Sequence, residues 1–233
     1  MPKEKELLID PAVYFASFSG STDDNWGFTA TYDGQGNFYA GGIVFGSFGT
    51  FPVSNGAFQT TFGGGVPEGD IGAMDIGIIK FDPSGVNRLY ATYIGGKGNE
   101  QPHSLVVDAS GNLIIAGRTS SGNTYPVRGL STYGPLGGLF DIVITKLNVT
   151  GSSIIGSVRM GGSGDDGVNI RPNYIKPQVS ESTRRNYGDD ARSEVIVDGA
   201  GNIILASATQ SEDFRTTPGS FQTTPGKKTT TRF

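Results

Sequence analysis

Four short motifs recur along the chain in an unchanging order, and this repetition restricts the possible folds more than any other feature. The first motif is an aspartate followed by a glycine and an asparagine, and its copies are Asp33–Asn37, Asp108–Asn112 and Asp198–Asn202. The second runs from a glycine to an acidic residue, and its copies are Gly20–Asp24, Gly96–Glu100 and Gly162–Asp166. The third motif occurs at Asp75–Phe81 and Asp141–Leu147, and the fourth at Phe51–Thr61 and Phe214–Thr224, with a degenerate copy at Tyr125. Internal similarity of this kind indicates a repeat architecture.

Each repeat is predicted to consist of short strands joined by tight turns. The apolar runs 104–108 and 112–116 flank Ala-Ser-Gly, which is the pattern of a β-hairpin. The glycine of this motif can adopt a positive φ, and aspartate and asparagine are favourable neighbours in a turn. Further strands are predicted at 13–18, 141–147 and 153–160. The predicted turn residues are Asp33, Gly36, Asn37, Asp108, Gly111, Asn112, Asp198, Gly201 and Asn202.

The repeat favours an all-β fold, namely a β-propeller with four-stranded antiparallel blades. A four-stranded unit is longer than a solenoid coil and matches one blade. The runs 113–116 and 195–197 are apolar throughout, as expected for strands packed between two neighbouring blades. We expect a lead-in at 1–12, blades over 13–224 with an inserted loop at 167–192, and a tail at 225–233. Because propellers need about 4–8 blades and roughly two and a half are present, the chain is predicted to be part of a larger ring.

The motifs resemble the bacterial seven-bladed β-propeller repeat known as the SBBP repeat. The segments 9–28 and 185–194 are similar to large gliding-motility-associated surface proteins that carry a type IX secretion sorting domain. The resemblance implies export to the bacterial outer surface, a role in adhesion or structural display, and the remaining blades of a longer chain as partners. It implies no catalytic residues.

Composition and charge exclude several classes of function. The formal net charge of −4 provides no basic excess to attract a nucleic-acid backbone. Cysteine is absent, which removes disulfides and thiol chemistry. No apolar run is long enough for a transmembrane helix, and the charged N-terminal segment lacks the apolar core of a signal peptide. Localisation is therefore predicted from the resemblance alone.

A calcium site is the weaker of two interpretations for the acidic residues. Calcium requires six to eight oxygen ligands, whereas each aspartate–glycine–asparagine motif supplies one carboxylate, which favours a turn. The better calcium candidates are two acidic pairs that bracket the inserted loop and could converge, and these pairs are Asp165 with Asp166 and Asp189 with Asp190. Otherwise no cofactor is predicted.

The inserted loop provides the candidate ligand-binding residues. Insertions in repeat arrays lie in loops on one face, which is often the binding face. Here Arg184, Arg185, Tyr187 and Tyr174 suit a polar or anionic surface such as a glycan or a protein. The predicted function is a non-catalytic propeller module, and the alternative is a carbohydrate-active or glycan-binding propeller that uses this loop.

Two further residues are given structural roles. The sole histidine, His103, would have to serve any Ser–His–Asp triad, and its neighbour Ser104 is unsuitably placed. Trp26 could stack on a sugar ring, but it stands at the start of a predicted strand and is expected to pack.

Overall fold

The computed structural model describes residues 12–46, 49–67, 72–129, 132–168 and 193–226 and shows an all-β protein. The only helical element in these ranges is the short 3₁₀ turn η1 (Gly122–Thr124). Among the same residues, no helix has the length and apolar character needed to span a membrane. Most of the predicted insertion, 169–192, lies outside the described residues.

The strands form three sheets that follow one another along the chain. The first contains β1 (Asn25–Tyr32), β2 (Phe38–Phe45), β3 (Met74–Phe81) and β4 (Arg88–Ile94), antiparallel and in chain order. The second contains β5 (Glu100–Val107), β6 (Leu113–Thr119), β8 (Asp141–Leu147) and β9 (Ile154–Met160), in that order and antiparallel. The short β7 (Thr132–Tyr133) pairs with β9 in parallel. The third is the hairpin of β10 (Ser193–Val197) and β11 (Ile203–Ser207).

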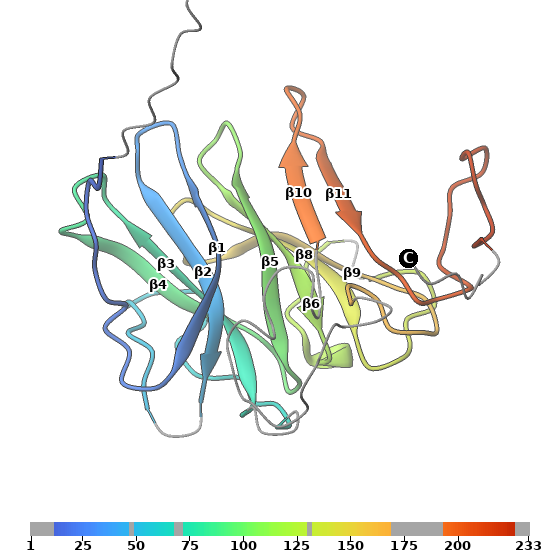
Figure 1. Cartoon of the computed structure of the whole chain (residues 1–233), viewed down its shortest axis with the longest axis horizontal. Helices are drawn as coiled ribbons and strands as arrows, with labels where there is room; N and C mark the ends of the chain where they lie inside the picture. Colours follow the sequence, from blue (N-terminus) through green and yellow to red (C-terminus); the bar gives the residue numbers. More distant parts are fainter. Residues whose placement is uncertain (1–11, 47–48, 68–71, 130–131, 169–192, 227–233) are drawn as a thin grey trace, which may run out of the picture.

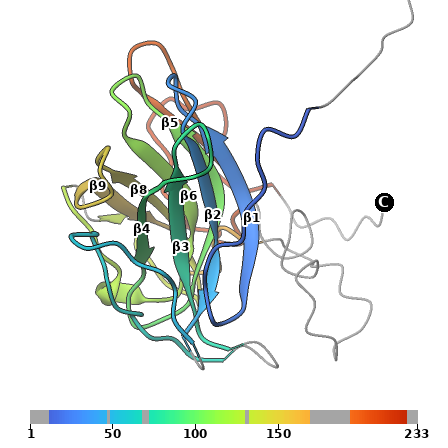
Figure 2. The same ribbon diagram turned by 90° about the vertical axis from the view of Figure 1, so that its left-hand side faces the viewer.

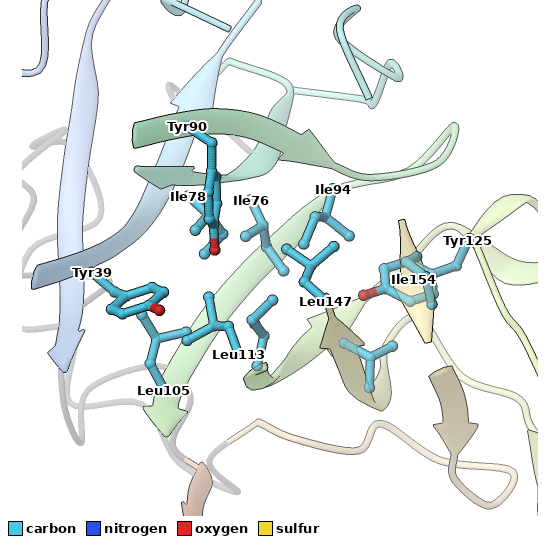
Figure 3. Packing of buried hydrophobic residues seen from close by; sticks show 12 residues of the cluster. Tyr39, Ile76, Ile78, Tyr90, Ile94, Leu105, Leu113, Tyr125, Leu147 and Ile154 are labelled. Carbon is cyan, nitrogen blue, oxygen red and sulfur yellow. The ribbon is translucent and has the colours of Figure 1, made fainter. Parts of the chain in front are cut away.

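The sheets stand side by side, with the first strand of each next to the first strand of its neighbour (Figure 1). β5 contacts β1 on one side and β10 on the other. The largest core fills the space between the first two sheets, where Tyr39, Ile76 and Ile94 meet Leu113 and Leu147 (Figure 3). Stacking of this kind removes a large apolar area from water and holds the sheets together.

The second sheet is covered on both faces, as the apolar run 113–116 predicted. Residues 113–116 are fully buried, because one face meets the first sheet and the other meets β10 and β11 through Val195. The similar prediction for 195–197 is wrong. Val195 is 4% exposed but Ile196 is 59% exposed, because nothing among the described residues covers the outer face of the β10–β11 hairpin.

The predicted strand at 13–18 is also wrong. These residues form no strand. They lie instead over the outer face of the first sheet, where Phe15 packs edge-on against Phe38 at 5.7 Å between ring centroids. Val13, Tyr14 and Phe18 remain exposed.

The tight hairpins and the long connections lie at opposite edges of the sheets (Figures 1 and 2). The hairpin turns confirm the predicted geometry, because Gly36, Gly111 and Gly201 have φ values of 82°, 80° and 85°. In each turn the aspartate side chain accepts backbone hydrogen bonds and binds the asparagine amide, and the aspartates are Asp33, Asp108 and Asp198. The described parts of the connections 46–73 and 120–140, together with the crossovers 95–99 and 161–165, form the opposite edge, called here the long-connection edge.

Replacing Gly111 with valine should destabilise the fold by about 1–3 kcal/mol, because a β-branched residue is strained at a φ of 80°. A Cβ at this position would meet only Val149 at 3.5 Å, so backbone strain is the main cost. The measurement is the denaturant midpoint. Gly156→Val is the matched control, since a Cβ there meets nothing within 4 Å and no positive φ is required. Equal midpoints for both variants would contradict the turn assignment.

Candidate functional site

A polar pocket of about 420 Å³ opens at the long-connection edge of the second sheet. Its walls are Ser120, Gly122, Asn123 and Thr132, the run 134–139, and the strand residues Asp141 and Arg159. Most of these residues are polar or glycine. Leu136 in the wall has a φ of 55°, the only positive φ of a non-glycine residue in the described chain. Strained residues of this type cluster at ligand sites, which makes the pocket the leading candidate site.

Arg159 supplies the positive charge of the pocket. It stands near the end of β9 and is 5% exposed. Its Nη1 lies 3.9 Å from Asp141 Oδ2, and its Nη2 donates to Asn123 Oδ1 at 3.5 Å. Both contacts are long for interactions of a buried guanidinium, which has five N–H donors to satisfy.

Asp141 is the acidic neighbour of Arg159. Burial raises the pKa of Asp141 to about 6, although the Arg159 charge acts in the opposite direction. Asp166, from the next crossover, adds to the rise because it is a like charge nearby. Asp141 Oδ1 is buried and has no hydrogen-bond partner in the described chain.

The same arrangement of two carboxyl groups occurs at the previous crossover. Asp75 at the start of β3 meets Glu100 at the start of β5, as Asp141 at the start of β8 meets Asp166. Burial raises the pKa values of both Asp75 and Glu100, and their mutual proximity raises that of Asp75 further. A protonated Asp75 can therefore donate a hydrogen bond to the Glu100 carboxylate. This proton removes the repulsion that two buried carboxylates would otherwise suffer.

Small hydrogen-bond donors fix the second acid of each pair. Thr119 and Ser121 donate to Glu100, and the Gly96 N–H donates to it at 3.1 Å. In the next repeat, the corresponding donors to Asp166 are Thr209, Ser211 at 2.9 Å and the Gly162 N–H at 2.8 Å. The repeated motifs thus encode a repeated contact between consecutive repeats.

The glycine before each crossover allows the acids to approach. A Cβ on Gly95 would lie 2.2 Å from Asp75 Oδ1 and 2.7 Å from Glu100 Oε2. At Gly161 the corresponding distances are 2.4 Å to Asp141 Oδ1 and 2.7 Å to Asp166 Oδ2. Neither glycine has a positive φ. Close packing, rather than backbone freedom, therefore requires glycine at these positions.

The predicted ligand residues of the insertion cannot be placed. Arg184, Arg185, Tyr187 and Tyr174 all lie outside the described residues. Their role stays a prediction.

The calcium candidates are only partly described. Asp189 and Asp190 lie outside the described residues. Asp165 Oδ1 accepts a hydrogen bond from the Leu139 N–H at 2.5 Å, and Asp166 is fully buried among the hydroxyl donors already named. The described residues contain no group of three potential metal ligands. Calcium binding stays untested.

His103 and Trp26 occupy the structural positions expected for them. His103 is 6% exposed, and its Nδ1 lies 3.1 Å from Ser193 Oγ in β10, so it joins the second sheet to the third. Trp26 begins β1 and packs edge-on against Phe45 at 5.2 Å between ring centroids. Neither residue lines the polar pocket.

The sequence prediction missed Arg159, although a departure from the repeat could have revealed it. Aligning the second motif at Gly96 and Gly162 places Arg159 where the previous repeat has Tyr93. In the first sheet Tyr93 packs against Phe51 and Phe62, with ring centroids 5.2 Å and 6.1 Å away. An aromatic cluster in one sheet is thus replaced by a charged pocket in the next.

Comparison with known proteins adds no further constraint, because no family model and no curated protein matches the chain.

Replacing Asp75 with asparagine should flatten the pH dependence of stability. Burial raises the pKa of Asp75 to about 8, so the folded state holds a proton that the unfolded state releases above about pH 4. The free energy of unfolding should therefore fall as pH rises from about 4 to about 8, by at most about 1.4 kcal/mol per unit from this group. Asparagine stays neutral and removes this contribution.

The measurement is denaturant unfolding at intervals between pH 4 and pH 9. Asp24→Asn, which removes an exposed carboxylate, is the control and should keep the slope of the unmodified chain. An unchanged slope in Asp75→Asn would contradict the shared-proton contact.

Proposed function

We propose that the chain is a non-catalytic β-propeller module in which each sheet is a blade and the long-connection edge binds a partner. The proposal includes further blades of a longer chain beside the two outer faces. It also includes a place on the bacterial outer surface, in adhesion or display, for which the resemblance to SBBP repeats is the support.

The arrangement of the first strands supports the propeller. In a ring of blades the innermost strands lie around a common axis, and β1, β5 and β10 adjoin in that order. The exposed Ile196 and Ile204 on the outer face of the β10–β11 hairpin fit a surface that another blade would cover.

The position of the acids supports binding rather than catalysis. Glycoside hydrolysis requires two carboxyl groups on either side of a substrate bond. The two acid pairs of the described chain are buried, since Asp75, Glu100 and Asp166 are at most 1% exposed and Asp141 is 7% exposed. They join consecutive repeats, and of the four acids only Asp141 lines the polar pocket.

The polar pocket is the observation that carries the binding proposal. It lies on the edge where the long connections gather, and its lining offers hydrogen-bond donors and a positive charge. Within the alternative of a carbohydrate-active or glycan-binding propeller, glycan binding is therefore favoured over carbohydrate cleavage. A contribution of the 167–192 loop stays a prediction.

The test combines a glycan array with a hydrolysis assay. The chain should bind a subset of glycans without releasing reducing sugar. Asn123→Trp, on the exposed η1 turn at the pocket wall, should abolish this binding. Ala109→Trp, in the hairpin between β5 and β6 at the opposite edge, is the matched control and should not. Sugar release by the chain, or loss of binding in the Ala109 variant alone, would contradict the proposal.

A further inference from the structure

Arg159 occupies a site where the previous repeat has an aromatic residue. In the first sheet the corresponding Tyr93 is 5% exposed and closes an apolar cluster with Phe51 and Phe62. In the second sheet the guanidinium faces a cavity of about 420 Å³. Nothing in the packing of the repeat requires a charge at this position, because the first sheet packs without one.

The contacts of Arg159 leave most of its donors without a short hydrogen bond. Among the described residues its polar contacts are Asp141 Oδ2 at 3.9 Å and Asn123 Oδ1 at 3.5 Å. Neither has the bidentate geometry in which a guanidinium binds a carboxylate through two parallel N–H···O bonds. A buried charge that is paired so loosely is costly, and an anion of matching shape would lower that cost.

We propose that this pocket binds an acidic sugar residue, whose carboxylate pairs with Arg159 while its hydroxyl groups contact Asn123, Ser120 and Thr132. The inference rests on the proposed function, because it names the ligand class of the same binding edge. The sugar carboxylate would lie against Arg159, in the pocket that Asp141 also lines.

The lining of the pocket supports a sugar over other carboxylates. Asn123 and Thr132 are exposed at the rim and carry an amide and a hydroxyl, which match a ring rich in hydroxyl groups. The run 134–139 adds the peptide groups of three glycines together with the apolar side chains of Pro135, Leu136 and Leu139. The cavity volume falls within the range of roughly 300–1,000 Å³ that is usual for small-molecule sites.

The acids near Arg159 predict how binding depends on pH. Asp141 faces Arg159, Asp165 and Asp166, and burial raises its pKa to about 6. Below that pH Asp141 becomes neutral and no longer competes for the guanidinium. The sugar carboxylate, with an ordinary pKa of roughly 3.5, remains charged at pH 5. Binding should therefore be tighter at pH 5 than at pH 7.5.

The test is isothermal titration calorimetry of the full chain with three acidic sugars, galacturonic, glucuronic and N-acetylneuraminic acid. Galactose and glucose are the neutral counterparts, and N-acetyl-alanyl-alanine presents a carboxylate on a peptide. At least one acidic sugar should bind, its affinity should exceed that of the neutral sugars by about tenfold or more, and it should rise at pH 5.

Variants at the pocket should separate the role of Arg159 from a purely structural role. Arg159→Lys keeps the charge but loses the bidentate geometry, and it should weaken binding by about tenfold or more. Asn123→Asp places a carboxylate beside the guanidinium and should selectively weaken the binding of acidic sugars. Because the Asn123 side chain is exposed, this change should not affect folding. Arg88→Gln on β4, outside the pocket, is the matched control and should bind normally.

Three results would overturn the inference. They are failure of all three acidic sugars to bind, equal affinity for the neutral sugars, and unchanged affinity in both pocket variants. Binding of the peptide but of no sugar would show that the ligand is not a sugar, and it would leave the proposal of a binding module unaffected. Sugar release, by contrast, would refute the proposed function.

Discussion

The third strand of each complete sheet carries one charged contact at either end, and the rest of the structure depends on these two contacts. An aspartate at its start meets an acid of the following repeat, in the pairs Asp75–Glu100 and Asp141–Asp166. Its lysine meets the aspartate of the hairpin turn in the same sheet, at 3.3 Å for Lys80–Asp33 and 2.6 Å for Lys146–Asp108. Burial opposes the charged turn aspartates, but their hydrogen bonds outweigh it and lower the pKa values of Asp33 and Asp108 to about 2. One end therefore holds an ion pair, and the other holds two neighbouring acids, of which Asp75 and Glu100 can share a proton.

These contacts explain why the motif order never changes. The aspartate and the lysine of the third motif must reach partners in the second and first motifs, so an exchange of order would leave buried charges unpaired. The fourth motif serves the same contact, because Gln59 Oε1 accepts from the Gly95 N–H at 3.0 Å beside Asp75. Positions outside this framework can vary, and the replacement of Tyr93 by Arg159 in the next repeat is such a case. The proposed binding site thus lies where the second sheet differs from the first, while the contacts at both ends of the third strand are kept.

The sequence was sufficient to predict the local structure but not the contacts between sheets. The hairpins follow from the turn chemistry of Asp108, Gly111 and Asn112, which acts within five residues. The acid pairs could not be predicted, because Asp75 and Glu100 are brought together only when two sheets stack. The strand expected at 13–18 was wrong for a related reason, since the apolar pattern of a strand does not show whether the segment pairs at a sheet edge or packs on a sheet face, as Phe15 does against Phe38. Arg159 does not follow from the shared motifs, because it stands where the second sheet differs from the first.

The most direct test of this account is a carbon-detected NMR titration of the side-chain carboxyl groups, with Asp75 and Asp141 assigned. Burial beside a second acid raises the pKa values of both residues, to about 8 and about 6. The account therefore predicts that both carboxyl groups titrate well above the ordinary aspartate value of about 3.9. The exposed Asp82, whose hydrogen bonds with Asn87 and Ser84 lower its pKa, serves as the internal reference. Titration of Asp75 and Asp141 in the ordinary range would show that no proton is shared between the sheets and would contradict the account.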